Sequence, residues 1–352
     1  MLGKLGDKID AVIVATPDHT HAGITLAAIR EGKHVFTQKP LTHNVWEARQ
    51  IQKAAAGSKV ITRMGNQIHS HKFYRTAVQL VQSGAIGKVK QVHSWVGTTG
   101  HGRSGLLERP AIPQTAPANV NWELWIAGAP MRPFGGQNVY HPRTWRDWQD
   151  FGNGALGDFG CHIFDPVFTA LKITAAPTSI KTNHSGMNDE VWPAQTTVDY
   201  TFPGTRYTVN QSLNISWYDG GLLPSVRGSH VPATTALPRS GSLIIGEIGT
   251  LVLPHVGAPR LYPEDKFGPF EAAENLNHFH GWIDGCITGK QPSDGFDYAA
   301  TLTEAVLLGN VGARFKGQTL KWDSRNLRIT NVREANRWLK RDYRDGWEIR
   351  PA

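Results

Sequence analysis

Three short apolar segments alternate with two helical patterns at the start of the chain, and this order constrains the fold more than any other feature. The apolar segments are rich in β-branched residues, as in buried parallel strands, and they lie at residues 10–15, 33–37 and 58–64. The helical patterns lie at residues 21–31 and 42–56, with Thr20 and Thr42 at their starts and Gly32 and Gly57 at their ends. Such an order predicts a doubly wound α/β sheet of parallel strands.

Polar residues follow these predicted strands at the point where each of them ends. Ligands of doubly wound sheets lie in the crevice beyond the carboxyl ends of the strands. We therefore expect a binding crevice formed by residues at these ends and at the start of the next helix: Thr16, Pro17, His19, His21, Gln38, Lys39, Asn66 and Gln67.

The pattern changes after a predicted helix at residues 71–83. Further strands are expected at residues 88–96, 177–184, 194–202, 206–217, 241–246 and 250–254, and further helices at 155–172, 272–288 and 297–315. This arrangement predicts an α+β domain with a large, mostly antiparallel sheet. The expected division is a doubly wound α/β domain at residues 1–85, an α+β domain at 86–325 and a basic C-terminal tail at 326–352.

Composition places the chain among ordinary globular proteins. Of its 352 residues, 40% are hydrophobic and 19% are charged, which is enough apolar surface for a core. Two cysteines, Cys161 and Cys286, do not supply a disulfide framework. No run reaches the roughly 18 apolar residues of a membrane span, and the N-terminus lacks the apolar region of a signal peptide. We expect no membrane partner and a cytoplasmic protein by default, with periplasmic export open if a signal lies upstream.

The net charge of +8 does not indicate a nucleic-acid-binding surface. Many of the basic side chains lie between residues 314 and 350, where acidic residues such as Asp323, Glu334, Asp342 and Asp345 interrupt them. Mixed charges of this kind are typical of a solvated, salt-bridged segment. We therefore expect no nucleic-acid partner, whereas anionic small ligands remain compatible with the charge.

The stretch Trp148 to Pro166 (W-Q-D-F-G-N-G-A-L-G-D-F-G-C-H-I-F-D-P) combines four glycines with a helical pattern. Asp158, His162 and Asp165 have helical i, i+4, i+7 spacing and share one face. A carboxylate one turn from an imidazole can orient that ring for proton transfer. The alternative is a glycine-rich loop that leads into a helix whose polar groups bind each other.

Aromatic and hydrogen-bonding residues gather in the loop-rich segment at residues 98–145. Aromatic faces pack on the C–H faces of sugars, and Arg, His and Asn can bind hydroxyls. The candidate substrate-binding residues are Trp122, Trp125, Tyr140, His141, Trp145 and Arg146. The alternative is that Trp122 and Trp125 anchor a long loop.

Two other motifs carry little functional weight. Gly100, Gly102 and Gly105 form a literal G-x-G-x-x-G, but the prolines that follow exclude the helix that a dinucleotide-binding motif needs. We interpret it as a loop. Histidines occur in close pairs, such as His19 with His21, but each pair lies in a different segment of the chain. We therefore expect no metal site, because such a site needs three or four ligands held together.

Several segments together resemble the Gfo/Idh/MocA oxidoreductase family, which includes glucose–fructose oxidoreductase and inositol dehydrogenase. They are D-A-V-I-V-A-T-P-D-H-T-H…G-K-H-V-F-T-Q-K-P-L at Asp10 to Leu41, G-N-Q at Gly65 to Gln67, W-x-x-W-x-x-G-x-P at Trp122 to Pro130 and G-A-L-G-D-F-G-C-H-I-F-D-P at Gly154 to Pro166. The resemblance implies a partial Rossmann-type sheet in the first domain. It also implies that the crevice residues hold NAD or NADP.

The family's reaction, as the resemblance implies it, is hydride transfer between a sugar or polyol carbon and a nicotinamide. Its Glu-Lys-Pro lysine corresponds to Lys39, and its D-x-x-x-H pair corresponds to Asp158 and His162. Lys39 would polarise the reacting oxygen, His162 would accept its proton, and Asp158 would orient the imidazole or hold a neighbouring hydroxyl. Asp165 would then be structural.

The chain departs from the family pattern in two places. Gln38 replaces the family's glutamate, so we expect weakened or altered function there. The family's first strand, glycine-rich turn and following acidic residue have no counterpart before Asp10. We therefore expect either a truncated chain or a protein without a pyrophosphate site.

Two further functions and an assembly state stay open at this point. An NAD-dependent glycoside-cleaving enzyme of the same family is one alternative, and a non-catalytic sugar-binding protein is the other. A dimer or tetramer through the C-terminal sheet is expected, because a sheet with helices on one face has another face to bury.

Overall fold

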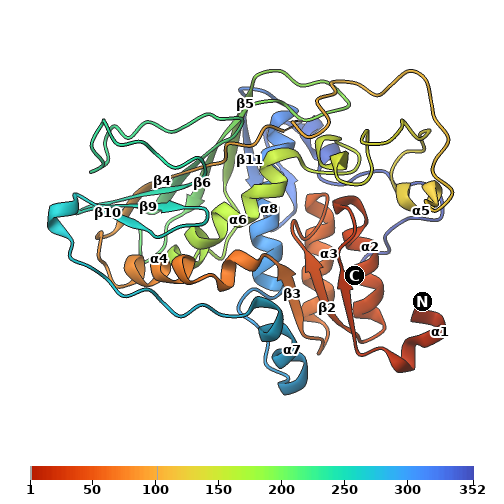
Figure 1. Cartoon of the computed structure of the whole chain (residues 1–352), viewed down its shortest axis with the longest axis horizontal. Helices are drawn as coiled ribbons and strands as arrows, with labels where there is room; N and C mark the ends of the chain where they lie inside the picture. Colours follow the sequence, from red (N-terminus) through yellow and green to blue (C-terminus); the bar gives the residue numbers. More distant parts are fainter. Residues whose placement is uncertain (1, 101) are drawn as a thin grey trace.

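The computed structural model describes residues 2–100 and 102–352, which form two sheets with helices packed against them (Figure 1). The smaller sheet has three parallel strands in the order β1-β2-β3. Its strands and the helices between them are β1 (Ala11–Val14), α2 (Asp18–Arg30), β2 (His34–Gln38), α3 (Val45–Ala56) and β3 (Thr62–Gly65). This part of the doubly wound α/β prediction is confirmed.

Both helices of this region begin at residues other than the threonines expected as caps. Helix α2 begins directly after Pro17, and the Thr20 hydroxyl donates to the Pro17 carbonyl instead of capping the helix. Helix α3 begins after Asn44, whose side chain accepts a hydrogen bond from the Glu47 backbone, while the Glu47 carboxylate accepts one from the Asn44 backbone. Such a reciprocal capping box outcompetes a threonine two residues earlier.

The larger sheet has nine strands in the order β10-β9-β8-β4-β7-β6-β5-β11-β12. All neighbouring pairs are antiparallel except β4 with β7, so the expected mostly antiparallel sheet is confirmed. The strands are β4 (Val89–Trp95), β5 (Ser179–His184), β6 (Thr196–Pro203), β7 (Ser212–Tyr218), β8 (Gly241–Gly246), β9 (Thr250–Pro254), β10 (Arg260–Tyr262), β11 (Thr319–Asp323) and β12 (Arg328–Ile329).

The remaining helices connect the two sheets or cover the larger one. They are α1 (Leu2–Leu5), α4 (Lys72–Gln82), α5 (Trp122–Ile126), α6 (Gly154–Leu171), α7 (His278–Thr288) and α8 (Phe296–Ala313). In the part of the chain that the structure describes, no helix combines the length and apolarity needed to cross a membrane.

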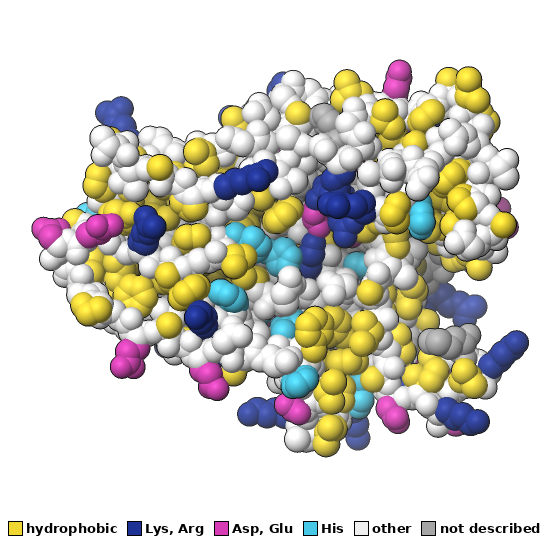
Figure 2. Space-filling model, in the orientation of Figure 1, with side chains coloured by type: hydrophobic (Ala, Val, Ile, Leu, Met, Phe, Trp, Pro, Cys, Tyr) yellow, Lys and Arg dark blue, Asp and Glu magenta, His cyan; other side chains and the backbone are white. Residues whose placement is uncertain are grey.

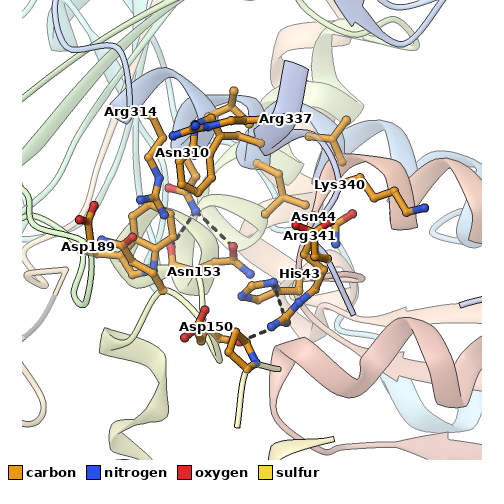
Figure 3. A pocket seen from close by; sticks show the side chains of 18 residues that line it. His43, Asn44, Asp150, Asn153, Asp189, Asn310, Arg314, Arg337, Lys340 and Arg341 are labelled. Atoms are coloured by element: carbon orange, nitrogen blue, oxygen red, sulfur yellow. Dashed lines mark hydrogen bonds between the residues drawn. The ribbon is translucent and has the colours of Figure 1, made fainter. Parts of the chain in front are cut away.

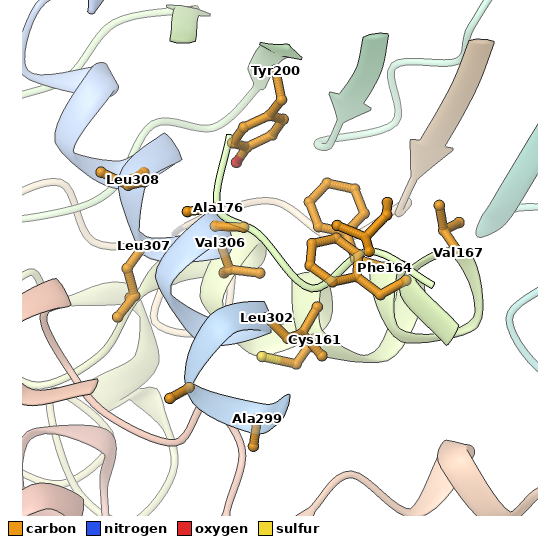
Figure 4. Packing of buried hydrophobic residues seen from close by; sticks show 14 of the residues in the cluster. Cys161, Phe164, Val167, Ala176, Tyr200, Ala299, Leu302, Val306, Leu307 and Leu308 are labelled. Atoms are coloured by element: carbon orange, nitrogen blue, oxygen red, sulfur yellow. The ribbon is translucent and has the colours of Figure 1, made fainter. Parts of the chain in front are cut away.

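Helices α6 and α8 pack against each other between the two sheets (Figures 1 and 4). Gly160 of α6 permits this approach, because a Cβ there would lie 2.9 Å from Val306 of α8. The core around them includes Phe164 and Tyr200, both fully buried. Helix α6 therefore has a fixed position relative to both sheets.

Two expected elements are shorter in the structure. Residues 206–211 turn, and strand β7 begins at Ser212. Helix α7 begins at His278 instead of residue 272, because the Asn277 side chain caps the backbone N–H groups of Phe279 and His280.

The C-terminal segment packs back on the first helices. The Trp46 backbone donates to the Leu339 carbonyl at 2.8 Å, and the Tyr343 hydroxyl donates to the Glu47 carboxylate at 2.7 Å. Buried Glu47 therefore has two partners, one in its own helix cap and one in the C-terminal segment.

Candidate active site

Lys39 and Asp158 form the centre of the site. Lys39 follows the last residue of β2, and Asp158 lies one turn into α6. The Lys39 ammonium donates to the Asp158 carboxylate at 2.5 Å and to the Asp158 backbone carbonyl at 2.8 Å. Both side chains are largely buried, with 14% and 13% exposed. The structure thus joins two residues that are 119 positions apart in the chain.

Two arginines also contact the Asp158 carboxylate. Arg103 binds one of its oxygens, and the Arg146 Nε lies 3.3 Å from the other. Burial by itself would raise the pKa of this carboxyl group, but the charges of Lys39, Arg103 and Arg146 outweigh burial and hold the pKa below its usual value. Asp158 is therefore an anion throughout the neutral range. In this structure it is hydrogen-bonded to these cations and not to His162.

His162 lies one turn further along α6 and is buried, with 7% of its surface exposed. Its Nδ1 has no hydrogen-bond partner among the described residues. Burial, followed by the charge of Lys39, lowers the pKa of this imidazole well below 6.5. Its ring lies 5.4 Å from that of His255, a residue that the sequence did not single out. His162 is thus a neutral base with a free nitrogen near neutral pH.

Asp18 is a further titratable residue of the site that sequence reasoning missed. It is buried at the first position of α2, and its carboxylate accepts a hydrogen bond from the Asn153 side chain at 3.2 Å. Burial raises the pKa of Asp18 to about 7, against the opposing charges of Lys39 and Arg146. Its place between Pro17 and His19, both expected in the crevice, was the available signal.

The two expected crevice histidines bind backbone carbonyls of the protein. His21 bridges the ends of two strands, with Nδ1 2.8 Å from the Pro40 carbonyl and Nε2 2.7 Å from the Thr16 carbonyl. His19 Nε2 lies 3.0 Å from the Trp125 carbonyl, and its ring packs against Phe151. Burial lowers the pKa of His21 to about 4 and that of His19 to about 3. Neutral rings here hold the strand ends and α5 together.

The other expected crevice residues lie at the carboxyl ends of the strands. Gln38 lies over Gly65, where an added Cβ would come within 2.7 Å of its side chain. Asn66 is buried and donates to the Asp165 carboxylate at 2.7 Å, whereas its Oδ1 has no partner among the described residues. The side chains of Thr16 and Gln67 are exposed, and Pro17 is half-buried.

Asp165 is the centre of a separate buried network on the second half of α6. The carboxylate has no exposed surface, and it accepts hydrogen bonds from neutral and ionisable groups of two segments before α6 and one after it. These partners are Asn66, His69, Tyr74 and Tyr298. The network supports the structural interpretation of Asp165.

Most of the expected sugar-binding residues belong to an aromatic cluster beside the site. Trp122 stacks on Trp125 with ring centres 4.8 Å apart, and Tyr140 and Trp145 are buried in the same cluster. The His141 ring meets Trp125 edge-on. Arg146 lies over the Trp145 ring and reaches Asp158, so it links this cluster to the site.

The segment with the literal G-x-G-x-x-G is a loop in its described part, and residue 101 lies outside that part. Arg103 of this loop binds Asp147 as well as Asp158. Sequence reasoning missed Arg103, because nothing local distinguishes it from other loop arginines. Among residues 2–100 and 102–352, no group of three or more His, Cys, Asp or Glu side chains could hold a metal ion.

The residues at the strand ends fit the nicotinamide end of a dinucleotide. The unpartnered, buried Asn66 Oδ1 can accept a hydrogen bond from a carboxamide. The Gln38 side chain packs directly over Gly65, which accommodates it because glycine has no Cβ.

Two sequence models of one family match successive parts of the chain. The model of the Gfo/Idh/MocA oxidoreductase family with an NAD-binding Rossmann fold matches residues 2–66. The model of the C-terminal α/β domain of that oxidoreductase family matches residues 75–210. Together the matches span more than half of the chain, and their order is that of the two sheets.

Relatives of known name match shorter segments. A 1,5-anhydro-D-fructose reductase of Ensifer adhaerens is 34% identical over 104 residues, which are 29% of this chain and 31% of that protein. A scyllo-inositol 2-dehydrogenase (NAD(+)) of Bacillus subtilis is 34% identical over 80 residues, 23% of each chain. The matched segments thus span less than a third of either relative.

A solved structure shares the fold over nearly the whole chain. An inositol dehydrogenase homologue from Azotobacter vinelandii, in complex with NADH and myo-inositol, aligns with a TM-score of 0.53 over 90% of this chain and 79% of that one. At 16% identity, this likeness concerns the fold alone.

Proposed function

The chain belongs to the Gfo/Idh/MocA oxidoreductase family, as its motifs predict, and on that premise we propose an NAD(P)-dependent sugar or polyol oxidoreductase. A bound NAD or NADP would supply the hydride acceptor for oxidation of the hydroxyl-bearing carbon, or the hydride donor for the reverse reaction. The Ensifer and Bacillus relatives are named for reactions of an anhydro sugar and of an inositol, respectively. Their names support this substrate class.

Lys39 and His162 have different roles at the reacting hydroxyl group. The Lys39 ammonium donates a hydrogen bond to the substrate oxygen and stabilises the negative charge that develops there. The neutral His162 imidazole accepts the hydroxyl proton as the carbon–hydrogen bond breaks. Asp158 holds Lys39 in place through two contacts.

The observation that carries the proposal is the combination of a fixed Lys39–Asp158 ion pair with a neutral, unpartnered His162 one turn away. A purely structural ion pair would not need a buried base beside it. A donor that stabilises an alkoxide and a base that removes its proton are the two groups that alcohol oxidation requires.

The test is nicotinamide reduction by the purified chain with a panel of polyols and sugars, including myo-inositol. Lys39→Ala is expected to lower kcat/KM by roughly 10²–10³-fold, as for other single donors to a developing oxyanion. Lys53→Ala, which removes an exposed lysine of α3, is the matched control. Full activity in Lys39→Ala would overturn the assigned role.

The same panel separates the other two functions. Sugar release from a glycoside without accumulation of reduced nicotinamide would identify a glycoside-cleaving enzyme. Sugar binding without any affinity for NAD or NADP would identify a binding protein.

A homo-oligomer through the C-terminal sheet stays a prediction, as does the cytoplasmic location. Exposed side chains of β5, β6 and β7 include Lys181, Asp199 and Asn214. These polar groups provide no apolar driving force for association at this part of the sheet. Light scattering on the purified protein measures the assembly state.

A further inference from the structure

A cavity of about 500 Å³ lies apart from Lys39 and His162, between the start of α3, the end of α8 and the C-terminal segment (Figure 3). Ligand sites of small molecules commonly have volumes of about 300–1,000 Å³. The residues that define its chemistry are Asn153, Asn310, Arg314, Trp338 and Arg341. None of them belongs to the site proposed for catalysis.

Arg314, at the end of α8, enters the cavity between two indole rings. Its guanidinium carbon lies 4.0 Å from the centre of the Trp338 ring and 5.5 Å from that of Trp192. Among the described residues, its guanidinium forms no salt bridge or hydrogen bond. Burial lowers the pKa of Arg314 to about 10, so the group remains charged at neutral pH. Its donors are held by aromatic stacking but have no acceptor.

Arg341 supplies a second charge to the cavity. It donates to the Asp150 carbonyl at 3.1 Å and lies 3.5 Å from His43 Nδ1, whereas its Nε has no partner. Burial lowers the pKa of this guanidinium as well. Within the described residues, no carboxylate lies at salt-bridge distance from it. Asp150, which lines the same cavity, is already paired with Arg132.

Neutral hydrogen-bonding groups line the cavity between these two charges. The Asn310 amide donates to the Asn153 carbonyl at 3.1 Å and lies 3.3 Å from the Asn153 side-chain oxygen (Figure 3). The Asn44 Nδ2 and the Gln149 Oε1 are buried and have no partner among the described residues. Such unsatisfied donors and acceptors suit the hydroxyl groups of a ligand.

We propose that this cavity binds a small polyhydroxylated anion, such as a sugar acid or a sugar phosphate, with its carboxylate or phosphate on Arg314 and Arg341. The half-buried Arg314 guanidinium feels the charge of exposed Asp189, but no carboxylate of the described residues lies at salt-bridge distance from it. A bound anion would supply charge-assisted hydrogen bonds at short range. The hydroxyl groups would meet Asn310, Asn44 and Gln149. The apolar face of the sugar would meet the Trp338 ring.

The cavity and the proposed active site are neighbours but use different cations. Asn153 connects them, because its amide donates to Asp18 while its carbonyl accepts from Asn310. The active site contains Lys39, Arg103 and Arg146, and all three are paired with Asp158. Binding in the cavity is therefore expected to depend on Arg314 and Arg341 and to be independent of Arg146.

The experiment is calorimetric titration of the full chain with gluconate and with inorganic phosphate at constant ionic strength, with sodium chloride as the blank. The two anions distinguish a carboxylate site from a phosphate site. Arg314→Gln and Arg341→Gln are each expected to weaken binding by about tenfold or more, since each removes charge-assisted hydrogen bonds. Arg333→Gln, which removes an exposed arginine of the C-terminal segment, is the matched control and is expected to bind normally.

Three additional variants keep the result interpretable. Arg337→Gln removes an exposed cation that lines the cavity and is expected to bind the anion several-fold more weakly. This variant tests the proposal even if Arg314→Gln fails to fold. Arg146→Gln and Lys39→Ala are expected to retain binding, so a failed catalytic assignment leaves this test intact. The proposal is overturned if wild type binds neither anion beyond the chloride blank, or if Arg146→Gln abolishes binding that the folded Arg314→Gln variant retains.

Discussion

The two halves of helix α6 carry similar residues in different surroundings. Asp158, in the first half, contacts three cations and retains 13% exposure. Asp165, in the second half, is fully buried and accepts hydrogen bonds from an amide, an imidazole and two phenols. One carboxylate neutralises and positions charged groups of the proposed active site. The other holds buried elements of the fold together.

This difference shows that the spacing of residues on a helix face does not assign their roles. Asp158, His162 and Asp165 share a face by sequence, and any two of them resemble an acid–base pair. Their roles follow from the groups packed against them, because a carboxylate paired with cations holds those cations in place, whereas a buried carboxylate surrounded by hydrogen-bond donors of the fold contributes stability.

Removing the proposed base, His162, from α6 is expected to have the largest effect on activity. His162→Ala should lower kcat by roughly 10²–10⁴-fold, the usual contribution of a general base. Because burial keeps the pKa of His162 well below 6.5, wild-type oxidation should stay constant as the pH falls through neutrality and decline only at more acidic pH. The variant should lack that decline. An unchanged pH–rate profile would assign the proton transfer to another group.

Removing the Asp165 carboxylate from the second half of α6 is expected to lower the stability of the fold. Asp165→Ala should lower the free energy of unfolding by roughly 3–5 kcal/mol, as for other broken buried ion pairs, because it leaves His69 and two tyrosines without their acceptor. Denaturant unfolding measures this change. Asp165→Asn, which preserves the shape, is the control and should cost less. An Asp165→Ala variant with wild-type stability and greatly reduced kcat would show instead that Asp165 acts in the reaction.

A substitution of Asp18 tests whether a buried carboxyl group in the proposed active site destabilises the folded protein. Its pKa is raised from 3.8 to about 7 in the folded protein, so the folded state retains a proton that the unfolded state loses across this window. The stability contributed by Asp18 is therefore full at the acidic end and falls as the pH rises towards 7. Relative to wild type, Asp18→Asn should gain stability over this range, by at most about 1.4 kcal/mol per pH unit. Thermal melting at several pH values measures it, and a difference that is constant with pH would contradict the assignment.

The smallest expected effect comes from removing one donor of the second network. Tyr74→Phe deletes the hydroxyl that donates to Asp165 at 2.9 Å, and the donors Asn66, His69 and Tyr298 remain. The expected loss is about 1 kcal/mol of unfolding free energy, with kcat unchanged. Chemical denaturation and steady-state kinetics on one preparation check both parts. A fall in kcat without a loss of stability would show that the network takes part in the reaction.

Local patterns predicted most of the fold. The β-branched runs that became β1 and β2 and the helical periodicity of α6 depend on near neighbours in the chain. Two of the boundaries that differed, at Thr42 and at residues 272–277, depend on capping groups that compete within a few residues. Asn277 prevailed because its side chain reaches two free backbone N–H groups.

The sequence by itself determined the two-sheet fold, the family and the three candidate catalytic residues, because these depend on local periodicity and on motifs carried by consecutive residues. Tertiary structure alone decided what those residues touch. Arg103 reaches Asp158 across 55 positions and Asn310 reaches Asn153 across 157. The raised pKa of Asp18 and the lowered pKa of Arg314 arise from burial by distant segments. Charge balance in a buried site is a sum over spatial neighbours, and the order of residues in a chain does not state which residues those are.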